Sequence, residues 1–298
     1  MKTLQSILFS LFVMTGLSTN ANDDLLKLIP SDCNIVMGFK ISEIFKIPLV
    51  KDLVEKNKEM LESQMSDPQA IKTMLLGVKA DSETALMGAD MQPQVFMVME
   101  MNEATSLEKM LEIGGKDIKF KKSKFLDKEY YEGEKDGQTL GIFKVSDTQF
   151  IAGTKDLLHK GIMINKGMGN SLSENAIIKK LLKSEGSLLY AGGFMTKSEE
   201  YKGFSLMSNY DKGIKLHTRV YCKKEDTATK LSTQINAVLP MVTANPQLGI
   251  KPTDITVASK ATTVSISAFI SEATLKQIPV LIQSMLMQSM SGESTPQQ

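Results

Sequence analysis

The chain has 298 residues, with 35 basic and 34 acidic side chains, two histidines, two cysteines and no tryptophan. Arg219 is its single arginine, and bidentate recognition of phosphates and bases depends on arginine geometry. The balanced charge and the presence of only one arginine therefore argue against a nucleic-acid partner.

Residues 1–21 have the features of a cleaved signal peptide. Lys2 supplies a positive charge, residues 7–17 form an apolar core, and Thr19 and Ala21 fit the small-residue positions before a cleavage site. The core is shorter than the roughly 20 residues that a membrane-spanning helix needs. We therefore expect a periplasmic or secreted protein whose mature chain begins near Asn22, with a short N-terminal membrane anchor as the alternative.

The first half of the mature chain, 22–170, alternates strands and helices. We expect a strand over 34–40, a helix that begins at Pro48, and a second helix that begins at Asp67 and ends at Gly77. A strand pair over 84–89 and 94–101 follows, and then a helix over 104–113. The next strands form a meander over 117–123, 128–134, 138–145 and 149–153, and a helix begins after Thr154.

The second half, 171–290, repeats this order after a glycine-containing linker at 166–170. Ser171 and Glu174 form a capping-box pattern before a helix over 175–183. A strand over 187–195, a hairpin over 203–210 and 213–222, and a helix over 226–242 follow.

The last unit is a hairpin over 254–259 and 262–270, followed by a helix from Glu272 to about Met290. An apolar row alternates with a mainly hydroxyl-bearing row in its second strand; the rows are Val264, Ile266, Ala268 and Ile270, and Thr263, Ser265, Ser267 and Phe269. This two-residue period predicts one face against a core and one face outward. The polar tail 291–298 is expected to be disordered.

These elements predict an α+β fold. We expect antiparallel sheets that are packed on one face by amphipathic helices. The chain would form two similar halves, each with the order strand, hairpin, helix, hairpin, helix. The order of the elements, rather than residue identity between the halves, indicates this internal duplication.

The two cysteines raise the question of a disulfide. Cys33 precedes the first predicted strand and Cys222 ends another. An oxidising compartment would allow a bridge between them, but the spacing alone does not show that their Cα atoms approach within about 7 Å. A Cys33–Cys222 disulfide and two buried free thiols therefore both remain open.

Several short strings in the chain carry a resemblance to a known family. The string 28–32 before an apolar strand, and the strings 130–133, 143–147 and 150–154, resemble landmarks of a family of exported bacterial proteins of unassigned function. That family is frequent in planctomycetes, verrucomicrobia and lentisphaerae. The resemblance covers most of the mature chain and implies an exported α+β protein; it implies no catalytic residue, because its motifs are turns and cap positions.

Catalytic and metal-binding motifs are absent from the sequence. His159 and His217 are the only histidines, and each is expected to be a surface or packing residue. A catalytic triad needs a base within reach of its nucleophile, and two Cys and two His that are far apart in sequence do not suggest a zinc site. The acidic stretch 132–136 lacks calcium-loop spacing and is interpreted as a solvated turn.

One cluster of positive charge stands out. Six lysines crowd a predicted strand region in which only Asp117 and Asp127 oppose them: Lys116, Lys119, Lys121, Lys122, Lys124 and Lys128. They are either a surface for anionic lipid or polysaccharide, or edge-strand lysines that discourage pairing with another chain. The second reading is preferred.

Together these features favour an exported, non-catalytic binding or envelope-associated protein without a cofactor. The runner-up is a periplasmic carrier of a lipid or other apolar ligand, held between a curved sheet and Met-rich helices such as 277–290. A hydrolase is the third hypothesis, and a pocket that joins His217 to a carboxylate and a hydroxyl would favour it. We expect no integral membrane segment after signal cleavage, and a partner that is either an envelope protein or an apolar ligand.

Overall fold

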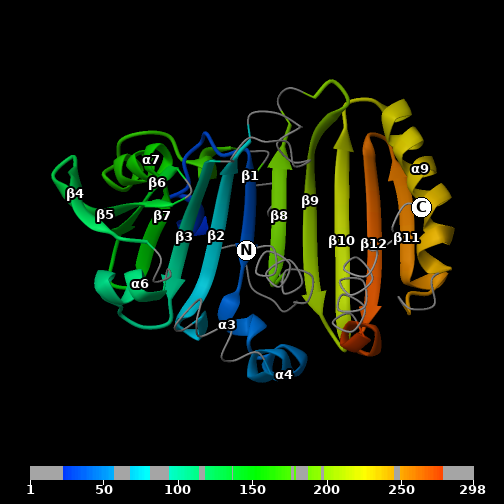
Figure 1. Cartoon of the computed structure of the whole chain (residues 1–298). Helices are drawn as coiled ribbons and strands as arrows, with labels where there is room; N and C mark the ends of the chain where they lie inside the picture. Colours follow the sequence, from blue (N-terminus) through cyan, green and yellow to red (C-terminus); the bar gives the residue numbers. More distant parts are fainter. Residues whose placement is uncertain are drawn as a thin grey trace, which may run out of the picture.

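Among the residues that the structure describes, 12 strands form one antiparallel sheet that organises the molecule (Figure 1). The structure, a computed structural model, describes residues 23–56, 68–80, 94–113, 118–135, 137–175, 178, 187–195, 198–244 and 249–277. The strand order is β11-β12-β10-β9-β8-β1-β2-β3-β7-β6-β5-β4. The predicted signal peptide, the strand 84–89, the tail and most of the helices 175–183 and 272–290 lie outside the described residues.

The strands have the following bounds. Those of the first part are β1 (Ile35–Phe39), β2 (Ile71–Lys79), β3 (Gln94–Met101), β4 (Lys121–Phe125), β5 (Lys128–Lys135), β6 (Gln138–Lys144) and β7 (Gln149–Thr154). Those of the second part are β8 (Leu189–Phe194), β9 (Tyr201–Tyr210), β10 (Gly213–Cys222), β11 (Ile255–Lys260) and β12 (Thr263–Ser271).

Short helices and 3-10 turns connect the strands. The helices are α2 (Asp23–Leu26), α3 (Ile41–Ile44), α4 (Pro48–Lys56), α6 (Leu107–Ile113), α7 (Lys155–Asn165) and α9 (Glu225–Thr243), and residues 272–277 are also helical. Among the described residues, no helix is both long and apolar enough to cross a membrane.

The predicted fold class is wrong, because the strands do not form separate sheets in two hairpin–helix halves. β8, which follows the linker at 166–170, pairs directly with β1 through Met37–Ala191 and its neighbours, so one ladder of hydrogen bonds continues through the middle of the molecule. Pattern analysis detects individual strands, but pairing between strands that are more than 150 residues apart leaves no local signal.

The helices also cover both faces of the sheet rather than one. Val36 and Phe39 lie on opposite faces of β1, because side chains alternate along a strand. Val36 belongs to a core with α2 and α7, whose buried members include Leu25, Leu26, Leu75, Val98, Ile151, Leu157, Leu158 and Ile162. Phe39 belongs to a core with α3 and α4, whose buried members include Ile44, Ile47, Val50, Leu189, Ile214 and Leu275. We call these surfaces of the sheet the α7 face and the α4 face.

Close packing at the centre of the sheet explains one glycine. The ring of Tyr190 on β8 lies against Gly38 on β1, where any Cβ atom would overlap the ring. A larger residue at position 38 would displace Tyr190, which is 1 % exposed.

The predicted helix between Asp67 and Gly77 is also wrong. Its second part is the central strand β2, which pairs with β1 and β3. Ile71, Thr73 and Leu75 are buried in alternation with more exposed neighbours. This period of two was overlooked because leucine and methionine also favour helices, and pairing on both sides overrides that preference.

The second half of the sheet has one apolar side and one polar side. On the α4 face, Ala228, Leu231 and Ile235 of α9 pack against Val264 and other residues of the sheet. The hydroxyl-bearing row of β12 therefore lies on the α7 face, as the alternation in sequence predicted. This polar side carries the site described next.

Candidate functional site

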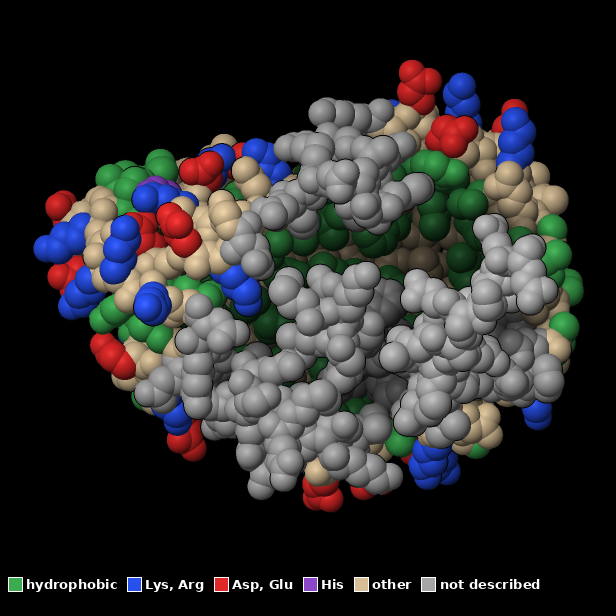
Figure 2. All heavy atoms as spheres, viewed as in Figure 1, with side chains coloured by type: hydrophobic (Ala, Val, Ile, Leu, Met, Phe, Trp, Pro, Cys, Tyr) green, Lys and Arg blue, Asp and Glu red, His purple; other side chains and the backbone are tan. Residues whose placement is uncertain are grey.

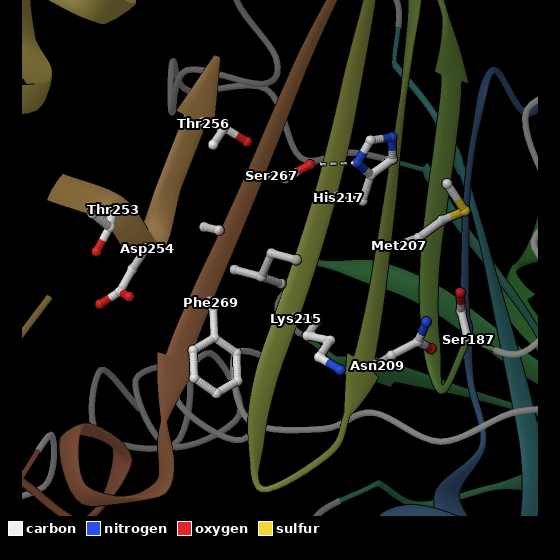
Figure 3. Close-up of a pocket in the computed structure, with 12 residues that line it drawn as sticks. Ser187, Met207, Asn209, Lys215, His217, Thr253, Asp254, Thr256, Ser267 and Phe269 are labelled. Atoms are coloured by element: carbon white, nitrogen blue, oxygen red, sulfur yellow. Dashed lines mark hydrogen bonds between the residues drawn. The ribbon is translucent and has the colours of Figure 1, made fainter. Parts of the chain in front are cut away.

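A cavity of about 510 Å³ lies over strands β9 to β12 and the 3-10 turn Pro252–Asp254 (Figure 3). Its lining combines hydroxyl, amide, charged and apolar side chains, contributed by Ser187, Met207, Asn209, Lys215, Leu216, His217, Thr253, Asp254, Thr256, Ser267, Ala268 and Phe269. We call it the β10 pocket.

Strand register places four residues of the β10 pocket in one row across the sheet. Met207 on β9 is opposite His217 on β10, His217 is opposite Ser267 on β12, and Ser267 is opposite Thr256 on β11. Cross-strand partners point to the same face. The row therefore presents a thioether, an imidazole and two hydroxyl groups to one side of the sheet.

The imidazole of His217 makes one hydrogen bond to the described residues, through a single ring nitrogen. Nδ1 lies 2.8 Å from Ser267 Oγ. Nε2 is buried and has no hydrogen-bond partner among the described residues. Figure 3 shows the ring on the β9 side of Ser267, with one edge toward that hydroxyl and the other turned away from it. Burial, reinforced by the positive charge of Arg219, lowers the pKa of His217, which favours the neutral ring.

Positive charge follows β10 along this face. Lys215, His217 and Arg219 alternate with residues of the opposite face. Their cross-strand partners are all uncharged: Asn209, Met207 and Ser205 on β9, and Phe269, Ser267 and Ser265 on β12. Lys215 Nζ is 2.6 Å from Asp211 Oδ2, but both side chains are more than half exposed, and an exposed pair of this kind contributes little.

One carboxylate also lines the β10 pocket, at a distance from the histidine. Asp254 Oδ2 accepts a hydrogen bond of 2.8 Å from the backbone N–H of Lys251. Figure 3 places Asp254 beside Thr253 on the β11 side, while His217 lies beyond β12. The pocket therefore joins a histidine, a hydroxyl and a carboxylate, but it does not arrange them as a relay.

The position of Ser267 is also unsuited to acyl transfer. A serine nucleophile needs nearby N–H donors that stabilise the oxyanion. Ser267 lies in the interior of β12, which pairs with β10 on one side and β11 on the other, and His217 lies in the interior of β10, which is likewise paired on both sides. The local backbone N–H groups are engaged in these ladders, so they are not available to a substrate.

A second polar cluster contains the other histidine, at the opposite end of the sheet. Glu132, which is 6 % exposed, receives hydrogen bonds from Ser123 Oγ (2.8 Å) and Tyr130 Oη (2.8 Å), and an ion pair from Lys155 Nζ (3.0 Å). These hydrogen bonds lower the pKa of Glu132 to about 2. The interpretation of 132–136 as a solvated turn was therefore wrong for Glu132.

His159 completes this cluster, which we call the Glu132 cluster. Its Nε2 lies 3.1 Å from Tyr130 Oη, and its ring stacks on Phe125 with centroids 3.8 Å apart. Because Tyr130 donates its only proton to Glu132, His159 Nε2–H donates to the Tyr130 oxygen. No buried side-chain nitrogen or oxygen atom of the cluster thus lacks a hydrogen-bond partner among the described residues, and burial lowers the pKa of His159.

The predicted lysine surface lies mainly on the edge strand β4. Lys119, Lys121, Lys122, Lys124 and Lys128 are exposed, and Lys116 is outside the described residues. Two glutamates on β5 also oppose the lysines, in addition to the aspartates named in the sequence. Lys121 lies 3.7 Å from Glu132, and Lys122 and Lys124 lie 3.1 Å and 3.7 Å from Glu129. Edge lysines with cross-strand partners fit the preferred edge-protection hypothesis.

The two cysteines are free thiols in the structure, and both are buried. Cys33 belongs to the core beneath α7, and Cys222 to the core beneath α9. Burial raises the pKa of the Cys33 thiol to about 12, with a further contribution from Asp32, and burial also raises the pKa of Cys222. Neither thiol is activated as a nucleophile.

The described residues contain no group of three or more His, Cys, Asp or Glu side chains that could hold a metal ion. No family model matches the chain, and no curated protein matches its sequence. Among solved structures, the chain is similar to TP0453 in its crystal form I, with a TM-score of 0.50 and 10% identity over 88% of this chain and 97% of that chain. At this identity the likeness concerns the fold alone.

Proposed function

We propose that this protein is an exported, non-catalytic binding protein and that the β10 pocket is its ligand-binding site. The volume of about 510 Å³ lies within the roughly 300–1,000 Å³ that is usual for small-molecule sites. Its lining also has the usual composition, because apolar side chains such as Met207 and Phe269 surround a few polar groups.

The unpartnered Nε2 of His217 carries this proposal. A buried polar atom without a hydrogen bond costs about 1–3 kcal/mol, so most such atoms in folded proteins have partners. A ligand in the β10 pocket that bonds to Nε2 accounts for a histidine held at this position by Ser267. The environment of Ser267 supports binding rather than acyl transfer.

Export is the second part of the proposal. It rests on the pattern of Lys2, the apolar core 7–17 and the small residues Thr19 and Ala21. N-terminal sequencing of the protein from its own cells is expected to begin near Asn22. A cytosolic protein that retains Met1 would contradict export without affecting the pocket.

Native mass spectrometry of the protein purified from its own envelope tests the binding role. We expect a non-covalent adduct in the wild type that Thr256→Trp abolishes, because the indole would fill the β10 pocket. Ala258→Trp is the matched control, since position 258 lies on the same strand, on the same face and outside the lining. An adduct that both variants retain, or no adduct in the wild type, would contradict this site.

A carrier of an apolar ligand is the second candidate function. Figure 2 shows a hollow over the middle of the sheet in which hydrophobic side chains are visible. On the α4 face, Leu206, Leu216, Val220 and Ile266 are only partly buried. A long-chain apolar adduct that persists in Thr256→Trp would support this candidate in place of the β10 pocket.

A further inference from the structure

We infer that the β10 pocket selects a small organic anion, with its carboxylate at His217 and an apolar body against Met207 and Phe269. This inference rests on the proposed function and names the chemical class of its ligand. Three features of the described residues support it: the charge along β10, the hydrogen bond between His217 and Ser267, and the distribution of apolar side chains.

The charge along β10 favours an anion. A ligand group at His217 lies between Lys215 and Arg219, each two residues away on the same face, which is about 7 Å along a strand. The partners of these cations on both neighbouring strands are uncharged. Asp211 pairs with Lys215 at the exposed end, and Asp254 lies on the β11 side with its Oδ2 bonded to the Lys251 N–H. The positive side of the pocket is therefore its His217 side.

The hydrogen bond to Ser267 completes the recognition site. If Ser267 O–H donates to His217 Nδ1, the neutral imidazole must carry its proton on Nε2. An anion at Nε2 stabilises this tautomer, because the N–H then points at negative charge, and the two flanking cations stabilise the anion. Burial and Arg219 both lower the pKa of His217, so at neutral pH the uncharged ring can donate a hydrogen bond from its Nε2–H.

The apolar side chains of the pocket define the rest of the ligand. Figure 3 shows Met207 on β9 and Phe269 on β12, on either side of Lys215 and His217. A thioether and an aromatic ring at these positions suit a short apolar or aromatic body. The hydroxyl and amide groups of Ser187, Asn209 and Thr256 fit a compact polar ligand better than a long hydrocarbon chain.

Isothermal titration calorimetry with three matched probes tests this selectivity in the wild-type protein. The probes are 3-phenylpropionate, 3-phenylpropan-1-ol and 3-phenylpropylamine, which share a body and differ in the charge of the head group. A charge-assisted hydrogen bond is stronger than a neutral one, and we therefore expect the carboxylate to bind about tenfold more tightly than the alcohol and the amine to bind most weakly.

Variants separate the head-group contacts from the pocket itself. Lys215→Met and His217→Phe should remove most of the preference for the carboxylate over the alcohol, whereas Lys260→Met, which removes an equal charge on β11 outside the pocket, should preserve it. Equal affinity for carboxylate and alcohol, or tightest binding of the amine, would overturn the inference while leaving a binding pocket in place. Binding of none of the three would overturn it as well, and the adduct experiment with Thr256→Trp would then decide the proposed function separately.

Discussion

The two histidines of this chain make similar hydrogen bonds in opposite surroundings. His159 lies 3.1 Å from the Tyr130 hydroxyl, and His217 lies 2.8 Å from the Ser267 hydroxyl. Burial lowers the pKa of both. In the Glu132 cluster the bonds continue through Tyr130 to a buried carboxylate, whereas in the β10 pocket the second ring nitrogen has no partner among the described residues.

This difference separates a structural cluster from a binding site. A network in which every buried polar atom has a partner contributes to stability and offers a ligand no unsatisfied buried group. A buried polar atom without a partner costs stability, and binding sites commonly retain such costs. The residue types alone, a histidine beside a hydroxyl, do not distinguish the two cases.

Removal of Glu132 is expected to have the largest effect on stability. Glu132→Ala would leave Tyr130, Ser123 and Lys155 without their shared acceptor, and breaking a buried charged network costs about 3 kcal/mol or more. Urea unfolding at pH 7 measures this loss. Glu129→Gln is the control, because Glu129 is exposed and its removal should leave the unfolding midpoint unchanged. Equal effects of the two changes would mean that the Glu132 cluster is not a stabilising unit.

The same carboxylate predicts a pH dependence. Hydrogen bonds lower the pKa of Glu132 from 4.5 to about 2 in the folded protein. Its contribution of about 3 kcal/mol is therefore complete above pH 4.5 and disappears as the pH falls toward 2. The difference in unfolding free energy between the wild type and Glu132→Gln should be constant from pH 7 to about 5 and should shrink below that. His159 is present in both proteins, so its titration largely cancels. A difference in unfolding free energy that stays constant down to about pH 3 would contradict the low pKa of Glu132.

Many of the individual strands could be predicted from local pattern. The hairpin of β9 and β10 and the alternation of Ser265, Ile266 and Ser267 follow from the two-residue period and from turn residues. The single sheet could not be predicted, because it depends on the pairing of Met37 with Ala191, which are distant in sequence. β2 was mistaken for a helix since its central position, rather than its composition, determines its structure.

The candidate site was harder to predict than the fold. His217 and Ser267 are 50 residues apart, and they become neighbours only through the register of β10 and β12. The two residue types form no sequence motif. The one usable signal was that each residue lies in the polar row of a strand whose other row is apolar. Glu132 carried no such signal, because its neighbours in β5 are the half-buried Tyr131 and the buried Gly133.

Paired substitutions compare the two histidines directly. His159→Phe keeps a ring on Phe125 but removes the donor to Tyr130, which should cost about 1 kcal/mol. His217→Phe combined with Ser267→Ala removes both partners of one hydrogen bond together with the unpartnered nitrogen, so stability should change by less than about 0.5 kcal/mol or increase. Urea unfolding of both variants measures the contrast. A larger loss in the double variant would mean that His217 also belongs to a satisfied structural network.

The exposed lysines on and just before β4 should have the smallest effect. Lys119, Lys121 and Lys124 are exposed. Lys124 pairs with the exposed Glu129, and such a pair contributes little. Lys121 lies 3.7 Å from the buried Glu132, which keeps the closer Lys155 at 3.0 Å when Lys121 is replaced. Replacement of all three by Gln should leave the urea midpoint nearly unchanged. Binding to vesicles that contain anionic phospholipid should also be unchanged; a loss of vesicle binding at constant stability would favour the anionic-surface hypothesis over edge protection.

The most direct test of the contrast uses the fact that the chain has only two histidines. Their imidazole nitrogens give two sets of signals in a ¹H–¹⁵N NMR spectrum, which the His159→Phe variant assigns. Addition of 3-phenylpropionate should shift the Nε2 signal of His217 and leave both nitrogens of His159 unchanged. A shift of His159 without a shift of His217, or no shift of either, would contradict the account.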